Sequence, residues 1–260
     1  MQECRELSRH RAPIRVYGTE NPGADIRREW ISPEWAVVLA FDVTYNLRTV
    51  EPRLLPARTK MKPIRFRFDP EKMVAALTYL AERVSDLDAM KSVKLLFFAD
   101  KAHLLAYGRP IIGDAYYGLE HGPVPTATYS LIKQVLSSAV EKEAEQIARL
   151  IDEYLFVDRQ AQYPQFKAKK QPDMDLLSSS DVDALNATLE KYGNKTAIEL
   201  SELAHQQPEV RYADERRAEL HAGSVPIPFH LFFDPQKDKA ILSAVESRQE
   251  DRDFAESARW

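Results

Sequence analysis

The chain is poor in several features that mark common classes of protein, and each shortage excludes something. One cysteine among 260 residues, Cys4, rules out an internal disulfide framework and suits a reducing cytoplasm. Eight glycines are scattered singly, so there is no glycine-rich loop of the kind that cradles phosphates. No apolar run approaches the roughly 20 residues of a membrane span, and the N-terminus lacks the apolar stretch of a secretory signal. We therefore expect a cytoplasmic protein with no membrane segment.

The chain also lacks an excess of positive charge and any obvious metal motif. Its formal net charge of -4 argues against a nucleic-acid binder, because phosphate contacts need clustered Lys and Arg. The six histidines show neither an HExxH pattern nor paired spacing, and one cysteine cannot build a thiolate zinc site. We predict no metal and no cofactor. A site assembled from Asp100, His103, Asp114 and His121 stays open as an alternative.

Residues 1–60 differ from the rest of the chain. Nine of their ten basic residues are Arg, whereas the remaining 200 residues carry 12 Arg and 14 Lys. Prolines interrupt the segment, and only residues 35–43 have the composition of a strand or a short buried stretch. Two explanations stay open: an accessory extension, or upstream sequence translated from an early start codon. In both, we expect a domain at residues 61–256 and a short tail at 257–260.

From Asp69 onward, frequent helix signals predict a mainly α protein. Asp69 suits an N-cap and Pro70 the first helical position, and the apolar residues after them recur at three- and four-residue spacing. A second helix is predicted from Asp88 to about Tyr107, with Gly108 as its C-terminal stop. Its centre is apolar nearly all round, so it belongs in the middle of a bundle. Further helices are expected at residues 126–136, 141–154, 179–192, 196–205, 209–221 and from 234 onward.

The expected β content is small. A turn at residues 108–114 precedes a strand at 116–120, which the sequence His121-Gly122-Pro123 should break. Residues 155–159 and 163–169 have the pattern of a small hairpin with a three-residue connection. The predicted fold class is therefore mainly α (α+β): a helical bundle around a central buried helix, with a short strand and a small β-hairpin.

Catalytic patterns are weak in the second helix. Ser92 and His103 share a face with Asp100, but they lie about 16 Å apart along the axis, at about 1.5 Å per residue. A general base must reach within about 3 Å of the proton that it removes, so a triad is excluded. We interpret Asp100 and His103, three residues apart, as an internal pair that orients this helix. Neighbouring carboxylates such as Asp181 and Asp183 are most simply solvated helix faces.

Lysines and aromatic residues near the end of this helix are the candidates for binding a partner. Lys91, Lys94 and Lys101 project from one side, where they either snorkel over the core toward acidic helices or border a recognition groove. Tyr and Arg are enriched among interface hot spots, although core packing is equally plausible for at least one of the tyrosines. The candidate partner-binding residues are Lys91, Lys94, Lys101, Tyr107, Arg109, Tyr116, Tyr117 and His121.

The stretch KLLFFADKAHLLAYGRPIIGDAYYGLEHGPVP resembles the signature of SocA-like antitoxin domains, also called Panacea domains. Downstream, LSSSDVDALNATLEKYGNKTAIELSELAHQQP and FFDPQKDKAILSAVESRQEDRDF are similar to further blocks of that family, so the resemblance covers about residues 62–255. One departure is Glu209-Val210-Arg211, where relatives place an aromatic residue, which puts a partner contact there in doubt. The resemblance identifies as structural motif residues Asp100, His103, Gly108, Pro110, Gly113, Asp114, Gly122 and Pro123.

The resemblance implies the antitoxin of a bacterial or phage toxin–antitoxin pair. Such a protein binds and neutralises a cognate protein toxin, which a neighbouring gene encodes. An alternative that the resemblance also implies is an adaptor that delivers the toxin to a Clp-type AAA+ protease. Because the sequence lacks a catalytic constellation, we predict no enzymatic activity. A hydrolase that uses the region of Asp100, His103 and His121, and a DNA-binding regulator, are the less favoured alternatives.

Overall fold

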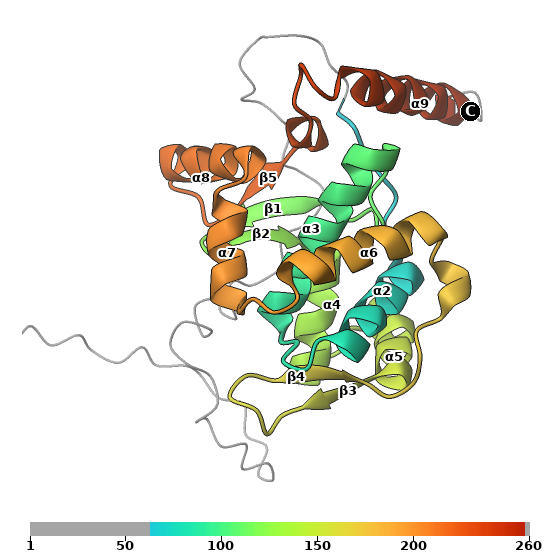
Figure 1. Ribbon diagram of the computed structural model, residues 1–260, viewed down its shortest axis with the longest axis vertical. Coiled ribbons are helices and arrows are strands. Elements are labelled where there is room, and N and C mark those ends of the chain that lie inside the picture. The colour runs from blue at the N-terminus through green and yellow to red at the C-terminus, as the bar shows by residue number, and fades with distance from the viewer. Residues whose placement is uncertain (1–62, 258–260) are drawn as a thin grey trace, which may run out of the picture. The chain divides into compact units, whose positions relative to one another are not determined.

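The arrangement of helices and strands is given by a computed structural model, which describes residues 63–257 (Figure 1). The helices are α2 (Pro70–Arg83), α3 (Ala89–Tyr107), α4 (Thr126–Ser137), α5 (Glu145–Tyr154), α6 (Ser179–Tyr192), α7 (Ala197–His205), α8 (Pro208–Leu220) and α9 (Lys239–Ser257). The strands are β1 (Tyr116–Leu119), β2 (Gly122–Pro125), β3 (Leu155–Asp158), β4 (Gln165–Ala168) and β5 (Val225–Ile227). Short 3-10 helices occur at η1 (Lys142–Ala144), η2 (Met174–Leu176) and η3 (Phe229–Phe232). Helices dominate, which confirms the prediction of a mainly α fold.

Some of the predictions concern residues that the structure does not describe. The extension at residues 1–60, with its candidate strand at 35–43, lies outside the described residues. The tail predicted at 257–260 is described only at Ser257, the last residue of α9. Residues 63–257 belong to one compact unit. Within that range, no helix combines the length and the apolar character that crossing a bilayer would require.

Helix α3 runs through the middle of the bundle because both its ends and its surface suit a buried helix. The Asp88 carboxylate accepts a hydrogen bond from the Lys91 backbone N–H at 2.7 Å, and Gly108, at φ 69°, ends the helix in the left-handed conformation. Helices α2, α4, α6, α7 and α9 all contact it. The predicted start, end and central position of this helix are confirmed.

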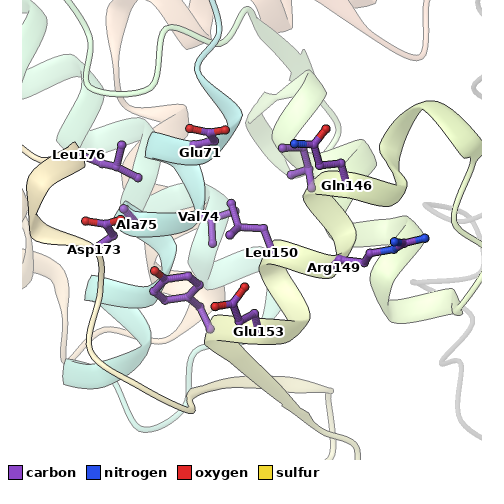
Figure 2. A pocket seen from close by; sticks show the side chains of 11 residues that line it. Glu71, Val74, Ala75, Gln146, Arg149, Leu150, Glu153, Asp173 and Leu176 are labelled. Atoms are coloured by element: carbon purple, nitrogen blue, oxygen red, sulfur yellow. The ribbon is translucent and has the colours of Figure 1, made fainter.

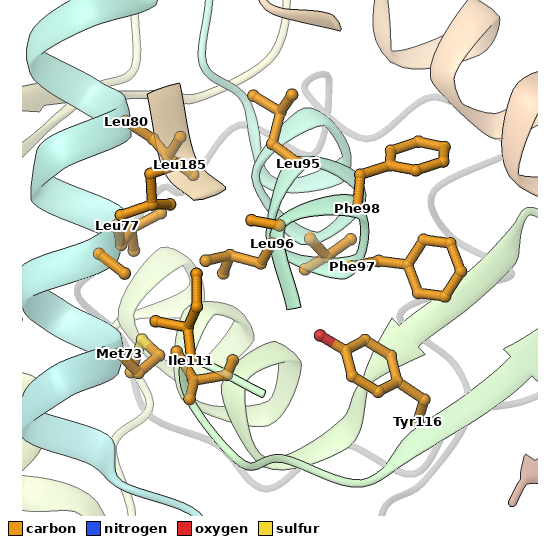
Figure 3. Close-up of a cluster of buried hydrophobic side chains, with 14 of the residues drawn as sticks. Met73, Leu77, Leu80, Leu95, Leu96, Phe97, Phe98, Ile111, Tyr116 and Leu185 are labelled. Atoms are coloured by element: carbon orange, nitrogen blue, oxygen red, sulfur yellow. The ribbon is translucent and has the colours of Figure 1, made fainter. Parts of the chain in front are cut away.

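The core lies between α3 and the elements around it (Figure 3). Leu77 and Leu80 of α2 and Leu96 of α3 are fully buried. The ring of Phe97 meets Tyr116 of β1 edge-on, with 5.5 Å between the ring centroids. Burying one such side chain stabilises a fold by roughly 1.5–3 kcal/mol, so α3 is the element on which the others assemble.

A three-stranded antiparallel sheet, in the order β2-β1-β5, packs against α3. The chain turns at Glu120 and His121, one residue earlier than expected, and Gly122–Pro125 then forms a strand where the sequence predicts only a break. Its prolines are tolerated because β2 is an edge strand, where a residue without an N–H need not interrupt a ladder. In the corner HGPVP, only His121 therefore belongs to the turn, and the other four residues form β2.

The third strand of this sheet comes from far along the sequence. Residues 225–227 form β5 and pair with β1, so that Gly118 lies opposite Val225. Directly after β5, the rings of Phe229 and Phe232 join the core, and the Phe232 ring lies 6.0 Å from that of Tyr116. Neither β5 nor this aromatic turn is predicted from the sequence, because Val225–Ile227 is only three residues long and contains one proline with another directly after it, which leaves almost no strand signal.

The small hairpin is confirmed, with a longer connection than expected. Strands β3 and β4 pair in antiparallel register from Leu155 opposite Ala168 to Asp158 opposite Gln165. Residues 159–164 connect them, instead of three residues. The Phe166 N–H also donates to the Leu87 carbonyl at 2.8 Å, which fixes the hairpin to the loop before α3.

One helix start is placed wrongly by the sequence. Asp234-Pro235 was expected to open the last helix, but α9 begins at Lys239. The Asp234 carboxylate instead accepts hydrogen bonds from the backbone N–H groups of Gln236 and Lys237, which closes a turn ahead of the helix. The pair Asp-Pro therefore starts a helix at Asp69 but closes only a turn at Asp234. A capping signal is local, and it does not determine whether the residues after it pack as a helix.

Candidate functional site

Asp100, in the fourth turn of α3, connects this helix to the turn and strand that follow it. Its carboxylate accepts hydrogen bonds from the backbone N–H groups of Ile111 and Ile112, at 2.8 and 3.1 Å, and from the Tyr116 hydroxyl at 2.9 Å. Burial raises the pKa of Asp100 to about 7, although these hydrogen bonds oppose the rise. Asp100 thus attaches the GRPIIGD turn and β1 to α3, and it is only 1% exposed.

Asp114 performs a similar role at the start of α4. Its carboxylate accepts hydrogen bonds from the N–H groups of Ala127 and Thr128, which are the unpaired donors in the first turn of that helix. Burial raises the pKa of Asp114, against the effect of those hydrogen bonds. The preceding Gly113, at φ 72°, approaches the Arg67 carbonyl so closely that an added Cβ would lie 2.2 Å from its oxygen. Asp114 and Gly113 are therefore structural.

His103 is held from both ring nitrogens. Its Nδ1 lies 2.6 Å from the Arg109 carbonyl oxygen, which can only accept, so Nδ1 carries the proton. Nε2 then accepts from the Ser180 hydroxyl at 3.0 Å. Burial lowers the pKa of His103, which favours this neutral form. The expected pairing of Asp100 with His103 is wrong: both orient α3, but each through partners of its own.

The centre of this region is Asp181, which the sequence analysis assigned to a solvated helix face. That assignment is wrong, because the side chain is fully buried. Its carboxylate contacts Lys72 Nζ at 2.6 Å and Arg109 Nη1 at 3.1 Å, and completes a capping box with Ser178. Burial alone would raise the pKa of Asp181, but hydrogen bonds from Lys72 and Ser178 outweigh it and lower the pKa. The only sequence signal was the capping spacing, Ser178 with Asp181 three residues on.

The rim of this cluster is open to solvent. Tyr107 is 48% exposed, and its ring lies 4.6 Å from that of the buried His103. The Arg109 side chain is 39% exposed and also donates to the Ser178 hydroxyl at 3.1 Å. We call Tyr107, Arg109, Ser178 and Ser180, gathered around the buried carboxylate, the Asp181 surface. Because two cations share one carboxylate while His103 is neutral, this surface carries an excess of positive charge.

Ser180, His103 and Asp181 do not form a hydrolytic triad. In such a triad the carboxylate binds Nδ1 and the serine binds Nε2. Here Asp181 Oδ1 lies 3.2 Å from Nε2, the nitrogen that also faces Ser180, and Nδ1 is taken by a backbone carbonyl. Among residues 63–257, no three His, Cys, Asp or Glu side chains are grouped so that they could hold a metal ion.

Three of the predicted partner-binding residues are buried. Lys91 is 1% exposed and pairs with Asp86 at 2.7 Å, and the hydroxyl of the equally buried Tyr116 donates to Asp100. Lys94 is also buried and donates to the Pro123 carbonyl at 3.0 Å. Burial lowers the pKa of Lys94 to about 7. These three side chains hold the core together, so the structure removes them from the expected contact surface.

His121 and Tyr117 belong to the corner between β1 and β2, where they are half-buried. The Ser201 hydroxyl of α7 donates to the His121 carbonyl at 2.7 Å. Gly122, at φ 91°, leaves room for the Lys94 ammonium, which would lie 3.1 Å from an added Cβ. The corner is therefore fastened to α7 and α3, whereas the Asp181 surface is built on α3 and α6. The candidate residues divide between these two places.

Lys101 joins α3 to the start of α8. Its ammonium donates to Gln207 Oε1 at 2.9 Å and to Glu209 Oε1 at 2.7 Å, and Glu209 itself is 1% exposed. Val210 is fully buried as well. Glu209 and Val210, two of the three residues at which the sequence departs from the family pattern, thus contribute to the packing of α8.

Part of the chain matches a known protein family. Residues 93–209 match the family described as "Antitoxin SocA-like, Panacea domain", which confirms the resemblance found in the sequence and indicates an antitoxin role with a toxin as partner. The match runs from the fifth residue of α3 to the second residue of α8, so it includes the Asp181 surface and the corner. No curated protein and no solved structure matches the chain.

Proposed function

We propose, on the basis of the SocA-like Panacea domain at residues 93–209, that this protein is an antitoxin that neutralises a cognate protein toxin by binding it directly. The toxin is expected to be the product of a neighbouring gene. The family match is the observation that carries the proposal. The geometry supports it, because Asp100, His103 and Asp114, the residues that suggest chemistry, are occupied in holding elements of the fold together.

The Asp181 surface is the proposed contact with the toxin. Tyr107 supplies a large amphipathic ring and Arg109 a planar donor, the two kinds of side chain that most often dominate binding energy at interfaces. Because Asp181 and Ser178 already hold the guanidinium, Arg109 loses little rotational freedom on binding. The excess positive charge favours a carboxylate of the toxin beside an apolar side chain.

A toxin contact must cover more than this one surface. A standard interface buries roughly 1,600 Å² in total, about half of it on each partner. Tyr117 and His121 in the corner are the candidates for an additional contact. Lys101 is a weaker candidate, because its ammonium is already neutralised by Glu209.

The test is growth rescue in a bacterium that expresses the product of the adjacent reading frame. Co-expression of the full chain should restore growth, and the double variant Tyr107→Ala/Arg109→Ala should not. Matched controls are Phe156→Ala, since Phe156 is 53% exposed, and Arg83→Ala, since its side chain is 39% exposed like that of Arg109. Both controls should rescue as well as the unchanged protein.

Two results would contradict the proposal. If the adjacent product arrests growth equally with and without this chain, the antitoxin role is wrong. If rescue succeeds but survives Tyr107→Ala/Arg109→Ala, the role stands and the assignment of the Asp181 surface fails. Melting temperatures of the purified variants show whether a loss of rescue comes from unfolding.

The toxin's half-life in the same cells distinguishes two modes of neutralisation. Sequestration leaves the toxin intact in a complex, so its half-life stays unchanged or increases. Delivery to a Clp-type protease shortens the half-life, and deletion of the protease restores it. We favour sequestration, because direct binding is enough to account for the function of an antitoxin.

A further inference from the structure

A groove between α2 and α5 shares no residue with the Asp181 surface or the corner (Figure 2). Its volume is about 410 Å³. Val74 of α2 and Leu150 of α5 lie at its centre, and Leu176 of η2 borders it. The groove is thus an apolar channel framed by two helices and a 3-10 turn.

The apolar floor exists because α5 has more apolar surface than the core covers. Ile147, Leu150 and Tyr154 recur at three- and four-residue spacing and form one stripe. Ile151 enters the core and is 1% exposed, whereas those three side chains remain half-buried at the groove. Half-buried aliphatic and aromatic side chains that line a shared concavity are typical of a surface that meets another protein.

Carboxylates dominate the rim of the groove. Glu71 and Asp173 form no ion pair with any other residue in the described part of the chain, and Glu153 pairs with Lys170. Arg149, the basic residue among the lining side chains, points away from the channel in Figure 2. The carboxylates of α5 are compensated by ion pairs with Arg149, Lys169 and Lys170, so the uncompensated charge at the groove is that of Glu71 and Asp173. A partner must therefore bring positive charge.

We propose that this groove docks an amphipathic helix of a partner protein, with aliphatic side chains along one face and Lys or Arg on both flanks. A channel between two helices accepts side chains that recur at i, i+3, i+4 and i+7 on a third helix, as in other helix-in-groove complexes. Basic flanks complement Glu71 and Asp173, whereas acidic flanks would be repelled. The proposal adds a second docking surface and does not depend on the antitoxin role.

The test uses the full chain and a fluorescently labelled synthetic helix with leucines at those positions and lysines on the flanks. Anisotropy at physiological ionic strength measures binding. Leu150→Glu should weaken it at least tenfold, because a carboxylate then lies on the floor. The double variant Glu71→Lys/Asp173→Lys should weaken it similarly. The matched control is Asp183→Lys/Glu190→Lys on α6, which changes the net charge equally and should leave the affinity unchanged.

Three results would overturn the proposal. The first is equal binding of a peptide with the same composition whose leucines and lysines are permuted, since binding would then not depend on the apolar face. The second is undiminished affinity in the Glu71→Lys/Asp173→Lys variant. The third is a dimer in light scattering that Leu150→Glu dissociates, because the groove would then hold a second copy of this chain. Circular dichroism and melting temperature verify that the variants fold.

Discussion

Replacing Asp100 with asparagine tests how a buried carboxyl holds the turn and β1 against α3. Asparagine has the shape of a protonated aspartate: its Oδ1 can still accept from the N–H groups of Ile111 and Ile112, and its Nδ2 can donate to the Tyr116 hydroxyl oxygen. Alanine removes every acceptor. Asp100→Ala leaves three buried donors without a partner, each costing about 1–3 kcal/mol, so it should destabilise the fold by several kcal/mol.

The effect of Asp100→Asn should depend on pH. Burial raises the pKa of Asp100 to about 7 in the folded protein, whereas the unfolded carboxyl titrates near its usual value of about 3.9. The folded state therefore binds more protons than the unfolded state between these values. The stabilising contribution of Asp100 is full below about pH 4 and is lost as the pH rises through about 7. Three pKa units correspond to roughly 4 kcal/mol, at about 1.4 kcal/mol per unit.

Urea unfolding at a series of pH values between 4 and 8 measures this contribution. Asp100→Asn should be close to the unchanged protein, or slightly less stable, at pH 4, and should gain on it by a few kcal/mol by pH 8. Asp183→Asn, at an exposed position on α6, is the control and should show no such trend. A constant difference between Asp100→Asn and the unchanged protein across the whole series would refute the reasoning from burial.

Three further predictions concern other buried groups. Burial lowers the pKa of Lys94 to about 7, so its contribution is full above about pH 10.4 and is lost as the pH falls through 7; Lys94→Met should gain relative stability from pH 10 to 7 in urea unfolding. Asp181→Ala removes the buried carboxylate that Lys72 and the partly exposed Arg109 share and should cost about 1–3 kcal/mol, whereas Asp183→Ala should stay within about 0.5 kcal/mol. An added Cβ at Gly118 would lie 2.5 Å from that of Ala213, so Gly118→Ala should cost about 1–3 kcal/mol. A double-mutant cycle with Ala213→Gly should recover part of this loss, and strictly additive effects would contradict the predicted clash.

The sequence predicted those parts of the fold that short-range interactions control. Asp69 and Asp88 accept hydrogen bonds from N–H groups three residues on, and Thr196 forms its capping box with Glu199 as its spacing indicated. Gly108 ends α3 because the left-handed conformation costs glycine nothing. Such signals depend on a few neighbouring residues, so they can be recognised from the sequence alone.

Segments stabilised by distant partners could not be found in this way. The strand Gly122–Pro125 has two prolines and one glycine, and forms because β1 offers it hydrogen bonds and α3 covers it. Strand β5 pairs with β1 from more than 100 residues downstream. A prediction from sequence patterns assigns such residues to loops, because their intrinsic preference for an extended conformation is too weak to indicate a strand.

The candidate site illustrates the same limit at single residues. Lys91, Lys94 and Tyr116 have the composition of a binding surface, but they are buried because each meets a polar partner inside the protein. Asp181 looked like part of a solvated helix face, and it is buried because Lys72 and Arg109 reach it. Whether a polar side chain faces solvent depends on which charges the fold brings to it.

By itself, the sequence determined the family resemblance, the central helix and most helix boundaries, because motif order, apolar periodicity and caps depend on residues close together in the chain. Only the tertiary structure decided that α3 and α6 meet around Asp181, that Tyr107 and Arg109 form its open rim, and that α2 and α5 leave an acidic groove between them. These features arise from contacts between segments far apart in the chain. Their energies depend on distance and burial, which no single segment contains.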